Sequence, residues 1–249
     1  MRTIHIPGDC IIRGWGLGIA ADAVPVSNPL YPFRSVWSIA NELLEENGAP
    51  ARAAWFSLPS PTWPGGAGVV SYRVGLDAQP GDFVLFQDAG NHNSDPDAYQ
   101  AAVEACLDAA AKPGVSVGIM TTFDYSPAPA DCQFDLEFNG RTINDAIRAA
   151  ASARSAPVLD MNAKMDGWRA SALSGDGVAV MHPDGIHPNV WGQIRMVGAI
   201  LAFVGLDGLL SYEGVKAIAS ANWEALRYGG GDSWSQSRAE AYASLVVAA

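Results

Sequence analysis

The fold of this 249-residue chain is constrained most by two sequence patterns that alternate over about its first 205 residues. Short apolar runs, each long enough for one buried strand, occupy residues 4–6, 51–56, 83–86, 115–122 and 157–161. Amphipathic patterns predict helices at 35–47, 95–110, 142–154 and 190–204. Strands that alternate with helices form βαβ units around a mainly parallel sheet. We therefore expect an α/β domain over 1–205 and a helical extension over 206–249.

The helix expected after residue 95 has the clearest local signals. Asp95 can accept hydrogen bonds from the first turn, and Pro96 suits the first helical position. Apolar residues then recur at helical spacing and predict the buried face: Tyr99, Val103, Cys106, Leu107 and Ala110. Cys106 is therefore expected in the core. His5 lies inside the first strand, where a structural role is expected.

The charge balance narrows the class of partner. The formal net charge is −11, and 49% of the residues are hydrophobic. An acidic surface does not neutralise phosphates or anionic lipids, so nucleic acid is not an expected partner. The apolar content is ample for a buried core. Neutral or cationic small molecules fit this balance better.

Leader, membrane and cysteine signals bear on the cellular compartment. The chain as given starts without a basic leader, and no apolar stretch reaches the roughly 20 residues of a membrane span. We expect no membrane span and a cytoplasmic or virion-associated location. Cys10, Cys106 and Cys132 leave at least one thiol without a disulfide partner, and their spacing fits no metal site. Reduced thiols are the expectation.

Gly8-Asp9-Cys10 follows the first expected strand and precedes a turn that contains Gly14 and Gly16. Ligands of α/β proteins bind at the carboxyl ends of parallel strands, so Cys10 lies where a reacting group is expected. A helix N-terminus and the nearby Arg13 would both favour its thiolate. The alternative is that Cys10 is a small buried apolar residue.

Far along the chain, Asp184 and His187 lie on a loop bounded by glycine and proline, just before the helix expected at 190–204. An imidazole can activate a thiol or hydroxyl, and an acid can orient that imidazole. The alternative is that His187 caps the helix. A metal site built from His92, His182 and Asp184 is another alternative, although their spacing matches no strong motif.

Together these motifs resemble the GDSL/SGNH hydrolase family over about residues 3–205. Gly8-Asp9-Cys10 with Gly14 and Gly16 looks like the opening motif, with cysteine where the family has serine. Residues 184–188 look like the closing DxxH motif, and residues 82–92 look like the strand followed by GxND. Ala89 and His92 depart from that last motif, whereas Asn91 keeps its asparagine. A second serine tripeptide, Gly231-Asp232-Ser233, follows a glycine run and is interpreted as a loop or helix cap.

The resemblance implies a three-layer α/β/α sandwich of flavodoxin-like SGNH architecture and an acyl-ester hydrolase. It implies a Cys10-His187-Asp184 triad and no cofactor or metal. The oxyanion hole would combine three kinds of hydrogen-bond donor, contributed by the Cys10 backbone, by Gly65 or Gly66, and by the Asn91 side chain. Cys10 would be native or a replacement for serine. An acyltransferase, or a catalytically silent carbohydrate-binding or virion-associated module, are the alternatives.

The expected substrate is a small or carbohydrate-linked acyl ester. Aromatic side chains suit sugar rings and acyl chains, and each is equally compatible with ordinary packing. The residues expected to contact substrate stand beside the motifs: Asp9, Trp15, Trp63, His92 and Trp191. The extension after residue 205 is expected to cover a sheet edge or to mediate homo-oligomer formation.

Overall fold

The computed structural model describes residues 1–8, 36–57, 66–87, 95–123, 140–174, 180, 188, 190–209, 211 and 213–216. At 36–38, 46, 55–57, 66, 68–69, 171–174 and 190 it describes the backbone alone. The chain divides into two compact units. Unit 1 comprises Met1–Ile12 and Pro50–Asn162, and unit 2 comprises Arg13–Ala49 and Ala163–Ala249. Both sides of the boundary expected near residue 205 lie in unit 2, and that boundary stays a prediction.

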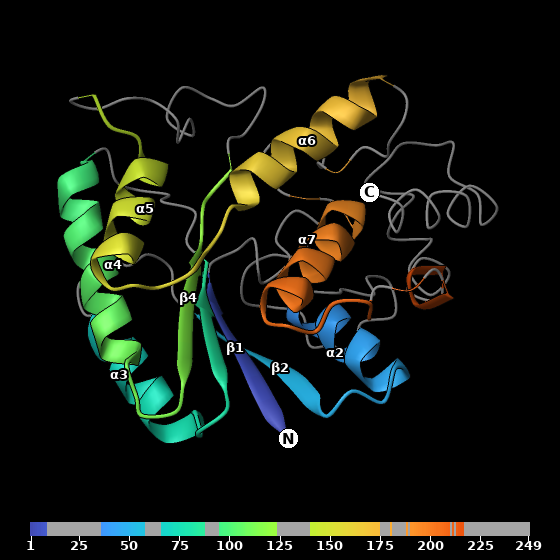
Figure 1. Cartoon of the computed structure of the whole chain (residues 1–249), viewed down its shortest axis with the longest axis horizontal. Helices are drawn as coiled ribbons and strands as arrows, with labels where there is room; N and C mark the ends of the chain where they lie inside the picture. The colour runs from blue at the N-terminus through green and yellow to red at the C-terminus, as the bar shows by residue number, and fades with distance from the viewer. Residues whose placement is uncertain are drawn as a thin grey trace, which may run out of the picture. The chain divides into compact units, whose positions relative to one another are not determined.

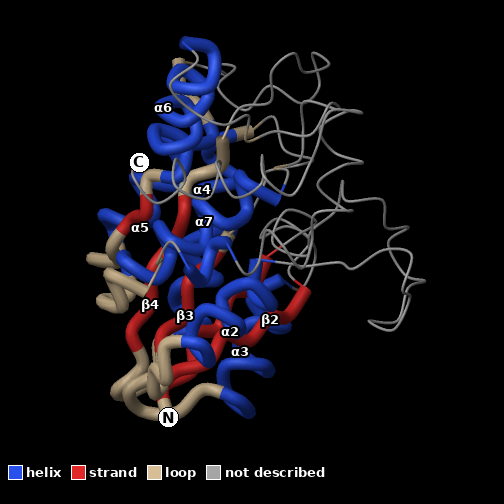
Figure 2. Tube along the Cα trace, turned by 90° about the vertical axis from the view of Figure 1, so that its right-hand side faces the viewer, coloured by secondary structure: helices blue, strands red, loops and turns tan. Residues whose placement is uncertain are grey.

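Unit 1 contains a parallel sheet whose order is β2-β1-β3-β4-β5 (Figure 1 and Figure 2). This is the flavodoxin-like order of doubly wound α/β proteins. The five strands lie where the apolar runs predict them: β1 Arg2–Gly8, β2 Ala51–Ser57, β3 Phe83–Phe86, β4 Ser116–Met120 and β5 Val158–Leu159. The expected parallel α/β fold is therefore confirmed.

Three helices of unit 1 cover one face of this sheet, on the left in Figure 1: α3 Gly66–Asp77, α4 Pro96–Ala110 and α5 Ile143–Ala153. Their shared core includes strand residues Val84, Phe86 and Ile119. The buried face of α4 contains the five residues that its periodicity predicts, Cys106 among them. The helical spacing of the apolar residues therefore predicted correctly which face of α4 is buried.

Side chains define where α4 and α5 begin. Asp95 accepts hydrogen bonds from the amides of Asp97 at 3.0 Å and Ala98 at 3.3 Å. Thr142 and Asp145 form a reciprocal capping box, with both hydrogen bonds at 3.0 Å. These contacts satisfy amides that have no partner within the helix, which is why both helices start where the sequence predicts.

Two helices were not predicted from the sequence. Helix α3 has glycines at 66, 68 and 75, and α6, Met161–Ser174, has Gly167 and only scattered apolar residues. Glycine disfavours a helix, so local propensity there is weak. Val70 and Val74 of α3, and Met161 and Met165 of α6, are buried all the same. Tertiary packing rather than propensity therefore stabilises these helices.

Unit 2 contains α2 Val36–Glu46 and α7 Val190–Phe203, which contact each other. Both lie where amphipathic patterns predict helices. The described core residues of the pair are Ile39, Ala40, Leu43, Leu44, Trp191, Ile194, Met196, Val197, Ile200 and Leu201. Asn47 follows α2 and donates through Nδ2 to the carbonyl oxygens of Leu43 at 2.7 Å and Leu209 at 3.2 Å. A short helical stretch at 213–216 lies within the helical extension expected over 206–249.

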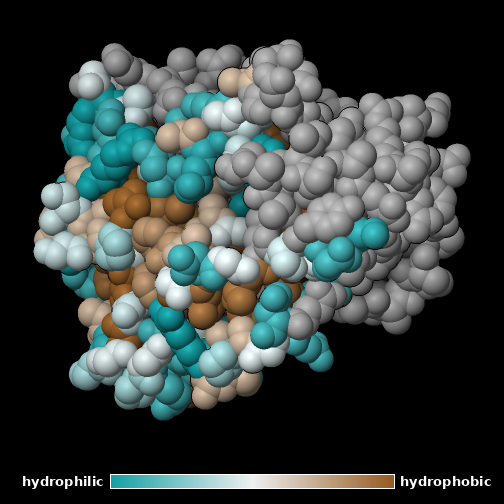
Figure 3. Space-filling model, turned by 45° about the vertical axis from the view of Figure 1, so that its right-hand side comes forward, coloured by the Kyte–Doolittle hydropathy of each residue, from teal (hydrophilic) through white to brown (hydrophobic). Residues whose placement is uncertain are grey.

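On the described part of the face in Figure 3, hydrophobic residues lie among hydrophilic ones. Among the described residues, the large apolar side chains with most exposure are Met1, Tyr72 and Leu76. In the same part of the chain, no helix is both long enough and apolar enough to cross a membrane.

Candidate active site at the carboxyl ends of the strands

Three strands of unit 1 end side by side and lead into segments that carry expected site residues. Gly8, the last residue of β1, pairs with Ser57, the last residue of β2. On the other side of β1, the amide of Gln87 donates to the carbonyl oxygen of Pro7 at 2.9 Å. The segments that carry Cys10, Gly65 and Asn91 therefore all start from one edge of the sheet.

The position of β1 within the sheet makes this edge an expected place for ligand binding. Strand β2 lies on one side of β1, and β3, the next strand along the chain, lies on the other side. The order in which strands are added to the sheet therefore reverses direction between β1 and β3. Ligands of open α/β sheets bind at such a switch point, outside the carboxyl ends of the strands. Asp9-Cys10 follows β1 at this point.

Most expected site residues lie outside the described residues. They are Asp9, Cys10, Trp15, Trp63, Gly65, Asn91, His92, Asp184 and His187. Gly66 is the first residue of α3. Amides in the first turn of a helix have no partner within it and lie at the positive end of the helix dipole. Gly66 therefore offers the kind of backbone donor that an oxyanion requires.

Trp191 is the one expected substrate-contact residue whose side chain lies within the described residues. Its side chain belongs to α7 in unit 2 and is 0% exposed. An indole without exposed surface contributes packing rather than an open binding face. For Trp191, the structure therefore favours packing, the alternative that the sequence left open.

Polar residues missed by sequence reasoning hold the carboxyl end of β4. Thr121 Oγ1 donates to Asp160 Oδ1 at 3.1 Å and accepts from the amide of Asn162 at 2.9 Å. Arg148 Nη2 donates to Asp160 Oδ2 at 3.0 Å. The only signal in the sequence was a pair of threonines directly after an apolar run. This network joins the ends of β4 and β5 to helix α5.

The neighbouring Thr122 is held separately. Its carbonyl oxygen accepts from Asn144 Nδ2 at 2.9 Å, and both residues are buried. Asn144 lies in the first turn of α5, so this bond ties the start of that helix to the end of β4. Together with the Thr121 network, it fixes the backbone on the β4 side of the candidate edge.

At the opposite, amino end of β3, Asp82 forms a buried cluster with β1. Its carboxylate accepts from the amides of Thr3 at 2.6 Å and Gln79 at 2.8 Å, and lies 3.3 Å from His5 Nε2. Burial raises the pKa of Asp82, but hydrogen bonds from Gln79, Thr3 and His5 outweigh it, so the pKa lies below its ordinary value. The expected structural role of His5 agrees with this pairing.

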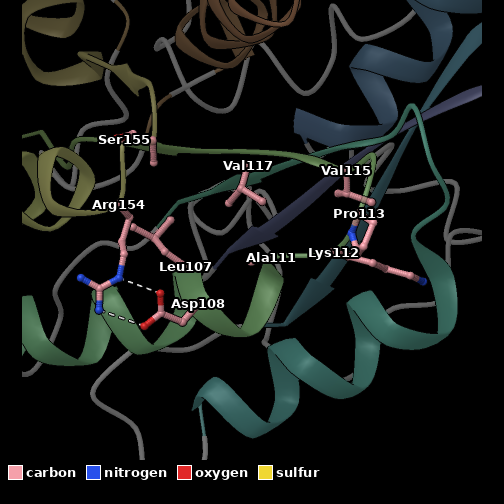
Figure 4. Close-up of a pocket in the computed structure, with 10 residues that line it drawn as sticks. Leu107, Asp108, Ala111, Lys112, Pro113, Val115, Val117, Arg154 and Ser155 are labelled. Atoms are coloured by element: carbon pink, nitrogen blue, oxygen red, sulfur yellow. Dashed lines mark hydrogen bonds and ion pairs between the residues drawn. The ribbon is translucent and has the colours of Figure 1, made fainter.

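A cavity of about 520 Å³ lies in unit 1 near the amino end of β4 (Figure 4). Arg154 points its guanidinium at Asp108, with Nε–Oδ1 and Nη2–Oδ2 distances of 2.6 and 2.9 Å. Lys112 points away toward α3 and donates to the Ala78 carbonyl oxygen at 2.7 Å. The charged groups that line this cavity already have partners, and the cavity lies away from the candidate edge. The cavity is therefore not part of the candidate site. Among the described residues, no group of histidine, cysteine or acidic side chains could hold a metal ion.

No family model and no curated protein matches the chain. Solved structures do match it. The psychrotrophic esterase EstA from Pseudoalteromonas sp., inhibited by monoethylphosphonate, matches with a TM-score of 0.59 and 13% identity over 82% of this chain and 97% of that chain. An Axe2 variant, an acetyl-xylooligosaccharide esterase from Geobacillus, matches with a TM-score of 0.54 and 17% identity over 83% and 95%.

A GDSL-like lipase from Parabacteroides merdae also matches, with a TM-score of 0.54 and 12% identity over 83% of this chain and 96% of that chain. All these likenesses are likenesses of fold. They confirm that this chain shares the parallel α/β fold of these solved structures.

Proposed function

We propose that this chain hydrolyses carboxylic esters, with Cys10 as nucleophile, His187 as general base and Asp184 as the acid that orients the imidazole. The observation that carries the proposal is the shared edge of β1, β2 and β3. From that edge start the segments that hold Cys10, Gly65 and Asn91. The solved structures that share this fold include esterases, which supports the same reaction class.

In the acylation step, His187 takes the proton of the Cys10 thiol, and the thiolate sulfur bonds to the ester carbonyl carbon. The carbonyl π electrons move to its oxygen and form a tetrahedral oxyanion. When the carbonyl re-forms, the bond to the alcohol oxygen breaks and His187 returns the proton to that oxygen. The products are a free alcohol and a thioester on Cys10.

In the second step, His187 removes a proton from water, and the hydroxide oxygen bonds to the thioester carbonyl. Collapse of that intermediate breaks the carbon–sulfur bond and returns the proton to Cys10. The acid leaves and the thiol is restored. Asp184 stabilises the imidazolium that forms in each step.

The oxyanion would accept hydrogen bonds from the amide of Cys10, the side chain of Asn91 and the amide of Gly65 or Gly66. Of the two glycines, Gly66 is favoured because it is the first residue of helix α3. Its amide lies at the N-terminal end of the helix, which carries a positive partial charge. Loss of one such donor typically lowers the rate about 10²–10³-fold.

Cysteine at this position changes the proton chemistry. A thiol loses its proton several pKa units more readily than a serine hydroxyl, so a thiolate–imidazolium pair can form before substrate binds. Arg13 and the dipole of a following helix would favour the same ionisation. We therefore assign nucleophilic chemistry to Cys10, whether the sulfur is native or replaces an oxygen.

The proposed substrate is a small or carbohydrate-linked acyl ester. The described function of the Axe2 neighbour, an acetyl-xylooligosaccharide esterase, supports this class. Trp15 and Trp63 would contact the sugar or the acyl chain, and Asp9 and His92 would contact its polar groups. The net charge of −11 favours a neutral substrate over an anionic one.

The test uses p-nitrophenyl acetate and mass spectrometry of the intact protein and its peptides. We expect an acetyl group on Cys10 in wild-type protein and in the control variant His182→Ala, which removes another imidazole close in sequence to His187. We expect none in Cys10→Ala or His187→Ala. An unmodified Cys10 in wild-type protein at saturating ester would refute the proposal. Continued acetylation of His187→Ala would refute the role of the base.

A further inference from the structure

The first turn of α7 contacts both ends of the segment that carries Asp184 and His187. Val180 and Pro188 flank residues 181–187, and both are buried. A Cβ placed on Gly192 would lie 3.0 Å from Pro188 Cβ and 3.2 Å from the Val180 carbonyl carbon, and closer still to the Val180 carbonyl oxygen. No side chain fits there unless one of these groups moves.

The close neighbour is a backbone group, which makes the contact costly to relieve. A flexible side chain could rotate away, whereas the Val180 carbonyl can move only with its segment of chain. Gln193, 0% exposed, adds a contact on the other flank, with Nε2 at 3.5 Å from the Pro188 carbonyl oxygen. Residues 192 and 193 of α7 therefore contact the chain on both sides of the Asp184–His187 segment.

The glycine is not required by its backbone. Gly192 lies inside α7, and its φ is not in the left-handed region where glycine is favoured. Glycine is a poor helix former, so a glycine inside a helix calls for another reason. The reason at this position is the close approach of the Val180 carbonyl and the Pro188 ring.

We infer that Gly192 is a positioning residue for the general base: its lack of a side chain permits the close approach of Val180 and Pro188, which flank the segment of Asp184 and His187, to α7. The inference rests on the proposed function, in which His187 exchanges a proton with Cys10. A general base must lie about 2.6–3.2 Å from the atom whose proton it takes. A methyl group at position 192 would displace Val180 or Pro188, and a shift of Pro188 would also displace His187, the residue before it in the chain.

The test compares Gly192→Ala with Gly167→Ala. Gly167 is a helical glycine of α6, also in unit 2, and a Cβ added there meets nothing within 4 Å. The probe is iodoacetamide, with alkylation of Cys10 followed by peptide mass from pH 5 to pH 10, because alkylation reports the thiolate. A thiolate paired with an imidazolium reacts even at acidic pH, whereas an unpaired thiol has a pKa of about 8.5.

We expect Gly167→Ala to keep the wild-type profile. We expect Gly192→Ala to alkylate Cys10 about tenfold more slowly at pH 6.5 and to approach the profile of His187→Ala, with a folded far-UV spectrum. A merely structural role for Gly192 would lower the Tm and leave this profile unchanged. A wild-type profile in folded Gly192→Ala would overturn the inference.

The variant His187→Ala distinguishes a failure of the proposed function from a failure of the inference about Gly192. If wild-type protein and His187→Ala give the same profile, Cys10 and His187 are not paired, and the proposed function fails. If they differ while folded Gly192→Ala matches wild type, only the role of Gly192 fails.

If Gly192→Ala does not fold, Gln193→Met removes the donor near Pro188 with little change in volume. We then expect a smaller slowing in the same direction. An unchanged profile in folded Gln193→Met would in that case overturn the inference.

Discussion

The amide of Gln87 donates to the carbonyl oxygen of Pro7 across 2.9 Å and thereby ties the end of β3 to the end of β1. Proline has no N–H to donate, but its carbonyl still accepts, so the ladder continues past Pro7. Asp9 lies two residues after Pro7, and Asn91 lies four residues after Gln87. This contact brings the chain that leads into the proposed nucleophile segment beside the chain that leads into the proposed oxyanion donor segment.

Asn91→Ala tests that placement. We expect the rate of Cys10 acetylation by p-nitrophenyl acetate to fall about 10²–10³-fold, because one oxyanion donor is lost. The iodoacetamide profile of Cys10 should not change, since the thiol and the imidazole remain. Stopped-flow release of p-nitrophenol measures the first effect. An equal fall in both reactions would show damage to the fold rather than loss of a donor.

Asp82→Asn should destabilise unit 1. Asparagine has one acceptor oxygen, so its amide nitrogen would face a backbone N–H of Thr3 or Gln79. A buried donor left without an acceptor costs about 1–3 kcal/mol. Urea unfolding followed by circular dichroism measures the loss. Asp77→Asn, at the exposed end of α3, is the matched control and should unfold as the wild type does.

The same carboxylate predicts a pH dependence of stability. The pKa of Asp82 in the folded protein lies below its ordinary value of 3.8, so the unfolded chain binds a proton first as the pH falls. Its stabilising contribution is present above that ordinary value and is lost as the pH falls through the folded pKa. We expect the free energy of unfolding of wild-type protein to fall more steeply below about pH 4 than that of Asp82→Asn. Parallel pH curves would contradict this assignment.

Trp191→Ala separates packing from substrate contact. Because the indole is 0% exposed, we expect a loss of about 3–5 kcal/mol of folding free energy. The KM of the folded fraction for a small ester should stay unchanged. Trp63→Ala provides the contrasting variant, with a raised KM for a carbohydrate-linked ester and little change in Tm. A raised KM in Trp191→Ala without a change in Tm would restore the substrate role.

Local sequence patterns predicted most of the elements because their causes are local. The cap at Asp95 and the capping box at Thr142 join groups within three residues of each other. The buried face of α4 follows from 3.6-residue periodicity alone. Helices α3 and α6 escaped prediction because their glycines and scattered apolar residues give no such signal.

The sequence predicts the candidate site as a set of motifs, because a nucleophile, a base and an amide donor are each recognisable by residue type, and these roles stay predictions. Sequence could not distinguish a tryptophan that binds substrate from one that packs, and only burial placed Trp191 in the interior. The polar network of Thr121, Asp160 and Arg148 also needed the fold, since it joins a strand end to a helix.

The sequence by itself determined where the strands and the predicted helices lie and which residues carry reactive groups, since both depend on neighbours along the chain. Tertiary structure decided which strands lie side by side. It also decided that the carboxylate of Asp82 meets the amide of Thr3, 79 positions away, and that the Val180 carbonyl lies close to Gly192. Such contacts depend on distances between segments far apart in sequence, which emerge only when the sheet and helices pack together.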